Sequence, residues 1–117
     1  MATPQPLQKG DRILILKERW LGMILSGEKT MEIRSKRLRA GRYYLGYKEK
    51  IYGCVSIGVA VPIATVEEWR ALYSRHLVSS STLPYECSTF GLPILSVHSM
   101  EGTYKHPKGA IGIVKYR

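Results

Sequence analysis

The sequence has few of the residues that mark disulfide-rich, metal-binding or membrane-spanning proteins. Its two cysteines, Cys54 and Cys87, are far apart and in no metal-ligand spacing. We therefore expect no disulfide, no metal and no cofactor. No apolar run approaches the roughly 20 residues that cross a bilayer, and the N-terminus lacks the apolar stretch of a signal peptide. The expected location is cytoplasmic, with the nucleus as the alternative, and neither secretion nor a membrane partner is expected.

Acidic residues are the other shortage. The chain has 9 Asp and Glu against 18 Lys and Arg, a formal net charge of +9. The excess is uneven, because residues 9–50 hold 12 basic and 5 acidic side chains, or +7 of the total. Such a field attracts polyanions. Charge alone does not separate RNA from DNA or from acidic membranes, and a basic protein without a polyanionic partner is the simpler alternative.

The length and hydropathy predict one domain. A chain of 117 residues with 44% hydrophobic residues has material for a single core. Residues 1–9 hold two prolines and no periodicity, so we expect a loose leader there and one domain over residues 10–117. We expect the protein to be a monomer.

Hydrophobic periodicity predicts mostly strands with two short helices. A helix is expected over residues 18–26, ended by Gly27, and a second over residues 65–77. The second begins with a capping box at Thr65 and Glu68, and its stripe of Val66, Trp69, Tyr73 and Leu77 should be buried. His76 should act as a cation near the C-terminus of that helix. Strands are expected over residues 12–17, 30–37, 42–47, 51–64, 92–100 and 109–116. Adjacent strands with two helical insertions favour an antiparallel or mixed barrel over repeated βαβ units.

The segment from Gly27 to Arg34 is the candidate functional site. The strand over residues 30–37 alternates, so Glu32 and Arg34 should share one face and Met31 should be buried on the other with Ile33. Lys29 should be exposed in the preceding turn. Lys29 and Arg34 can then hold a phosphate, while Glu32 accepts from a base edge. The structural alternative is an ion pair between Glu32 and Arg34 on a solvated strand face.

Gly27, Lys29, Glu32 and Arg34 form a Gly-x-Lys-x-x-Glu-x-Arg run after a short helix that carries Trp20. In this motif the chain resembles the ASCH family, a branch of the PUA-like superfamily of RNA-associated domains. Residues 41–45 and 106–112 resemble that family too. The resemblance implies an α+β fold, a small PUA-like β-barrel of five to six mixed or antiparallel strands with two flanking helices. It also implies a cleft lined by the motif.

Activity differs among the proteins that this chain resembles. Some bind nucleic acid, some are ribonucleases, and one bacterial branch hydrolyses an acetyl amide on a modified cytidine. That branch uses a Thr nucleophile two positions before the motif Arg, where this chain has Glu32. The cytidine-amide hydrolase activity is therefore not expected here.

The preferred hypothesis is an RNA- or nucleotide-binding module with a basic cleft. The expected partner is RNA, either single-stranded or structured, or a nucleotide-like ligand. Lys29 and Arg34 would bind a phosphate or a carbonyl edge of the ligand, and Glu32 would accept from a base edge or orient these two cations. Trp20 and Lys17 would border the cleft. Further cations would form a basic track that contacts the RNA backbone. The ligand-binding set is Lys17, Trp20, Lys29, Glu32, Arg34, Lys36, Arg37, Arg39 and Arg42.

Two alternatives remain open. One is a metal-independent ribonuclease that uses Lys29 with Tyr104 and His106 in the same cleft. The other is a scaffold that recruits a protein partner through its basic surface. Tyrosines near the third predicted strand serve either base stacking or barrel packing. They are Tyr43, Tyr44, Tyr47 and Tyr52.

Overall fold

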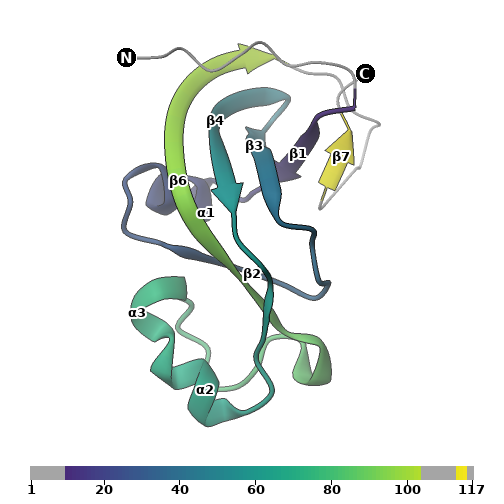
Figure 1. Ribbon diagram of the computed structural model, residues 1–117. Helices are drawn as coiled ribbons and strands as arrows, with labels where there is room; N and C mark the ends of the chain where they lie inside the picture. Colours follow the sequence, from purple (N-terminus) through teal and green to yellow (C-terminus); the bar gives the residue numbers. More distant parts are fainter. Residues whose placement is uncertain (1–9, 104–112, 116–117) are drawn as a thin grey trace.

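The fold was analysed in a computed structural model, which describes residues 10–103 and 113–115 (Figure 1). In chain order its elements are β1 Arg12–Ile15, α1 Glu18–Leu25, β2 Met31–Arg34, β3 Gly41–Tyr47, β4 Lys50–Ile57, β5 Val61–Pro62, α2 Val66–Ala71, α3 Tyr73–His76, the 3-10 helix η1 Glu86–Ser88, β6 Phe90–Thr103 and β7 Ile113–Lys115. The predicted leader, and most of the predicted last strand, lie outside the described residues.

A single mixed sheet forms the body of the molecule. Its strand order is β2-β6-β4-β3-β1-β7, and β5 also pairs with β6. Only β1 and β3 are parallel among the described pairs. The long strand β6 arches across the molecule (Figure 1), pairing with β2 over its first residues and with β4 over the rest. The sheet thereby curls into a half-barrel, which confirms the predicted small mixed barrel of the α+β class.

Breaks in the strand register produce this curvature. The β4–β6 pairing shifts between Ile51 and Gly53 and again between Ser56 and Ile57. Such bulges bend a strand and increase its twist. The glycines of this segment predicted a bulge or bend, and the predicted strand over residues 51–64 in fact divides at Gly58 into β4 and β5.

The predicted second helix is divided at Leu72 into α2 and α3. Its start is as predicted, because Thr65 Oγ1 accepts from the Glu68 backbone N–H at 3.1 Å. Burial of Tyr73 was wrongly predicted, since that side chain is 49% exposed. The helix is interrupted at Leu72, and the His76 ring instead of the Tyr73 ring stacks on Trp69.

The packing divides into clusters on either side of the sheet. The largest joins Leu14, Ile24, Tyr43, Leu45 and Leu92 from the first helix and the central strands. A second joins Met31, Ile33, Ile63 and Trp69 beneath the divided helix, which confirms that Met31 and Ile33 are buried. Strand β2 is therefore held between the barrel and the α2–α3 unit.

Candidate functional site

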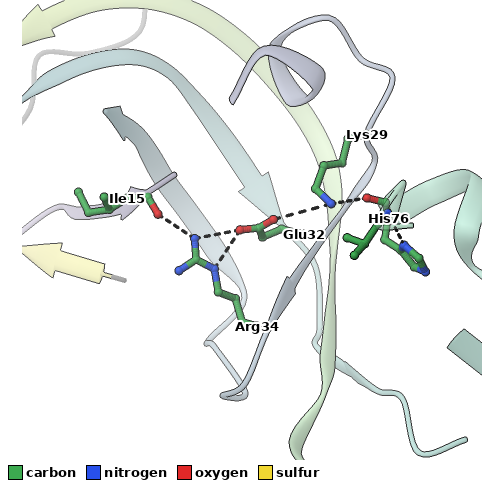
Figure 2. Close-up of polar contacts among 6 residues, drawn as sticks. Ile15, Lys29, Glu32, Arg34 and His76 are labelled. Carbon is green, nitrogen blue, oxygen red and sulfur yellow. Dashed lines mark hydrogen bonds and ion pairs between the residues drawn. The ribbon is translucent and has the colours of Figure 1, made fainter. Parts of the chain in front are cut away.

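Strand β2 presents Glu32 and Arg34 on one face, as predicted. Arg34 Nε and Nη2 both lie 2.9 Å from Glu32 Oε2, and Nη2 also donates to the Ile15 carbonyl at 2.9 Å (Figure 2). The ion pair of the structural alternative is thus present, but its setting differs. Glu32 is 5% exposed, so the pair is not on a solvated strand face. Charge-assisted bonds of this kind fix the orientation of both side chains.

Lys29 was wrongly predicted to be exposed, since it is 1% exposed. Gly27, at φ 86°, turns the chain after α1, and the Lys29 N–H donates to the Met23 carbonyl, which directs the side chain inward. Its Nζ donates to the His76 carbonyl and lies 3.9 Å from Glu32 Oε1 (Figure 2). It also lies 4.6 Å from the centre of the Trp20 ring.

The surroundings of Lys29 change its protonation. Burial of the ammonium lowers the pKa of Lys29 to about 8; the Glu32 carboxylate opposes this shift, and Arg19 and Arg34 add to it. Desolvation favours the neutral form of a buried amine. A lysine with such a pKa can lose its proton just above neutral pH, which an exposed lysine does not do.

His76 lies in the last turn of α3, near the end of the predicted helix, but its predicted role as a cation was wrong. Its ring is fully buried and stacks on Trp69, with centroids 3.7 Å apart. Nδ1 accepts from the Val78 N–H at 2.9 Å, so Nε2 carries the proton and lies 2.9 Å from the Trp69 carbonyl. Burial lowers the pKa of His76. The ring is therefore neutral, and it is the backbone carbonyl of His76 that meets a cation, Lys29.

Lys29, Glu32 and Arg34 line a cleft of about 910 Å³ between the end of β1, α1, β2 and the segment that follows α3. Lys29, Glu32 and Arg34 form what we call the cleft floor. Three further cations form what we call the cleft rim: Lys17, Lys36 and Lys48. Among the described residues, the charged side chains that line the cleft are thus five cations and one carboxylate. Three aromatic side chains also line it: Trp20, Tyr47 and Tyr85.

Six of the nine predicted binding residues line this cleft. They are Lys17, Trp20, Lys29, Glu32, Arg34 and Lys36. Arg37 and Arg39 lie instead at a separate hollow of about 280 Å³. Arg42 lies on β3, where its Nη2 is 4.0 Å from Asp11 Oδ1. Both predicted catalytic partners of Lys29, Tyr104 and His106, fall outside the described residues.

Other lining residues had no signal in the sequence. Tyr85 and Pro84 belong to a loop that was left without a role, and Lys48 belongs to the β3–β4 turn. Among the four tyrosines considered for stacking, Tyr43 and Tyr44 are buried in the core and Tyr47 lines the cleft. Only tertiary structure brings these segments beside β2.

Across the described ranges, no three His, Cys, Asp or Glu side chains gather closely enough to hold a metal ion. None of the helices in that same part of the chain has the length and apolarity needed to cross a membrane.

Comparison with known proteins supports the fold. No family model and no curated protein matches the sequence. Three crystal structures of an ASCH protein from Zymomonas mobilis, two of them mutant proteins, match with TM-scores of 0.70, 0.71 and 0.72. Sequence identity is 12–14%, over 93–94% of this chain and 89–91% of theirs. The resemblance to ASCH proteins that the motif indicated is therefore confirmed in the fold: this chain has the fold of those ASCH domain structures.

Proposed function

We propose that the protein binds single-stranded RNA, or a nucleotide, in the cleft above β2. The observation that carries this proposal is the lining of the cleft, in which five cations and one carboxylate are combined with three aromatic side chains. Proteins that bind single strands combine cations for the backbone with aromatic faces for the bases. The cleft volume of about 910 Å³ is also within the usual range for ligand sites.

Phosphate binding belongs to the rim in this proposal. The side chains of Lys17 and Lys36 are exposed and make no ion pair or hydrogen bond with the described residues. The floor cations differ, because Lys29 and Arg34 already contact Glu32 and backbone carbonyls. Free lysines release counterions when they meet phosphates, which makes binding depend on salt.

Binding of a labelled 12-nucleotide single-stranded RNA tests the proposal. We expect the dissociation constant to rise steeply between about 50 and 200 mM salt. The double variant Lys17→Ala/Lys36→Ala should bind more weakly with a smaller salt slope. Lys50→Ala is the matched control, since Lys50 is exposed but does not line the cleft. Binding that is unaffected by salt, or weakened equally by Lys50→Ala, would contradict a rim that holds phosphate.

One observation supports a second function, metal-independent cleavage of RNA. A buried lysine with a pKa of about 8 at the floor of a basic cleft can take a proton from a 2′-hydroxyl. Cleavage should then increase with pH through about 8, as Lys29 becomes neutral. Lys29→Arg should reduce the rate by about a hundredfold and the affinity far less, with no effect of EDTA. Cleavage that is unchanged in Lys29→Arg would come from a contaminant, and binding alone would stand.

A further inference from the structure

The cleft floor leaves one acceptor and one donor without a hydrogen bond. Glu32 Oε2 accepts both bonds from Arg34, whereas Oε1 accepts none from any described residue and has Lys29 Nζ at 3.9 Å. Arg34 Nη1 likewise donates to no described residue, since Arg34 contacts Glu32 and the Ile15 carbonyl through Nε and Nη2. The Glu32 side chain is 6% exposed. A buried carboxylate oxygen without a donor is costly, which favours a ligand that supplies one.

The acceptor at Glu32 Oε1 and the donor at Arg34 Nη1 determine which part of a nucleotide can bind at the cleft floor. A phosphate has only acceptor oxygens and negative charge, so the carboxylate of Glu32 repels it. The pairing edge of a nucleobase has an N–H donor beside an acceptor, such as N3–H beside O4 of uracil. That combination complements an acceptor at Glu32 Oε1 and a donor at Arg34 Nη1.

We propose that the cleft takes one unpaired nucleobase edge-first. Glu32 accepts from a base N–H, Arg34 donates to the neighbouring base acceptor, and the phosphate stays outside at the rim lysines. This inference rests on the proposed binding function and adds to it the orientation of the ligand. Because the pairing edge is used by the protein, a base within a duplex is excluded.

The opposite orientation, with phosphate on the floor, fits the contacts less well. It would need Lys29 and Arg34 to leave their present partners. Lys29 donates to the His76 carbonyl at the end of α3, and Arg34 joins Glu32 to the Ile15 carbonyl of β1. Both cations are thus used to fix the carboxylate and to tie β2 to its neighbours, while the rim lysines are available.

Three tetranucleotides with the same phosphates test the orientation by calorimetry. They are tetrauridylate, the same chain built of 3-methyluridine, which lacks the N3–H donor, and an abasic ribose-phosphate chain. We expect the methylated and abasic chains to bind at least about tenfold more weakly than tetrauridylate. Equal affinity for tetrauridylate and the abasic chain would overturn the proposal.

Glu32→Gln gives an independent test. The Arg34 donors should hold the carboxamide oxygen, so the amide NH2 would replace Oε1 as the group that faces the ligand. A donor then stands where an acceptor stood, and the preference for tetrauridylate over the abasic chain should fall to about threefold or less. Glu28→Gln is the matched control, because Glu28 is an exposed carboxylate outside the cleft, and it should keep the full preference.

The outcomes separate the two proposals. If none of the three tetranucleotides and no longer single strand binds, the proposed function fails together with the orientation. If all three bind alike, RNA binding stands and the edge-first orientation is wrong. A Glu32→Gln protein that tightens its hold on all three chains equally would also place phosphate at the floor and overturn the orientation. Should that variant not fold, the three ligands on the unmodified protein still decide.

Discussion

The floor and the rim of the cleft use charge in opposite ways. The floor residues Lys29, Glu32 and Arg34 are largely shielded from solvent and bound to one another and to backbone carbonyls. The rim residues Lys17, Lys36 and Lys48 are exposed. Charges in the floor are costly to desolvate and are stable only in fixed geometry, whereas rim charges are solvated and adaptable. Substitutions in the floor should therefore lower the free energy of unfolding, whereas those in the rim should weaken binding with little effect on unfolding.

The largest effect that this comparison predicts is on Glu32. Glu32→Ala removes the carboxylate that lies between Lys29 and Arg34, and with it the one anionic partner that these two shielded cations have among the described residues. We expect the free energy of unfolding to fall by about 3–5 kcal/mol. Lys36→Ala, at the rim, should change it by about 0.5 kcal/mol or less. Urea unfolding followed by circular dichroism measures both, and a loss below about 1 kcal/mol for Glu32→Ala would mean that the floor is no more constrained than the rim.

A smaller loss of unfolding free energy is expected when His76 is replaced. The backbone carbonyl of His76 accepts from Lys29 of the cleft floor. His76→Leu keeps an apolar contact with Trp69 but leaves the Val78 N–H without its acceptor, while the Trp69 carbonyl loses the ring as a donor and keeps the Leu72 N–H at 3.2 Å. We expect a loss of about 2–3 kcal/mol. Tyr73→Leu is the control, because that side chain is half exposed and makes only an edge contact with the His76 ring.

The same residue predicts a dependence on pH. Burial lowers the pKa of His76 in the folded state below its value in the unfolded chain. The unfolded chain thus binds more protons, and stability should fall as pH decreases below about 6.5. The His76→Leu protein should lose that part of the acid sensitivity. An identical pH profile for both proteins would show that His76 is not held neutral.

The sequence predicted the chemistry of the floor but not its burial. Alternation along residues 30–37 correctly joined Glu32 to Arg34, because strand periodicity is a local property. It also led to the expectation of a solvated face with Lys29 exposed. At Lys29 the partner comes from α3, whose last carbonyl accepts from Nζ, and at Arg34 it comes from the Ile15 carbonyl of β1. The charged residues of one strand give no sign of these partners, which only the tertiary structure brings to them.

The fold was predictable where local signals and packing agree. The capping box at Thr65 marks the start of α2, and Gly53 lies at a bulge. The break at Leu72 was not predictable, because an unbroken apolar stripe favours one helix. His76 stacks on Trp69 across this break, a contact between residues seven positions apart that the stripe did not indicate. The position of Tyr85 in the cleft lining was not predictable either, because long-range contacts set the path of its loop.

Lys29 should show the next effect in size, again through pH. Its pKa is lowered from 10.5 to about 8 in the folded protein, so the unfolded chain binds more protons between those values. Stability should therefore rise as pH increases from about 8, by about 1–2 kcal/mol at pH 9.5. The variant Lys29→Met lacks this gain. The unfolding free energies of the two proteins are compared at pH 7.5 and again at pH 9.5. Because both proteins contain the same tyrosines, the contribution of tyrosine titration cancels in each difference. A constant difference would mean that Lys29 is as solvated as a rim lysine.

The smallest effect concerns the boundary of the rim. Arg37 and Arg39 border the separate hollow, where Arg37 lies 5.2 Å over the Phe90 ring and its Nη1 is 3.5 Å from the Ala60 carbonyl. They can contact only an RNA that extends beyond the cleft. Arg37→Ala and Arg39→Ala should each weaken binding of a 12-nucleotide single strand about threefold and lower its salt slope by about one, because each removes one phosphate contact. Neither should change binding of tetrauridylate, whereas Lys36→Ala should weaken both ligands. Fluorescence anisotropy with the two RNAs distinguishes these patterns. If Arg39→Ala weakened binding of the short and the long RNA equally, the hollow would belong to the rim. If it weakened binding of neither, the RNA would make no contact beyond Lys36.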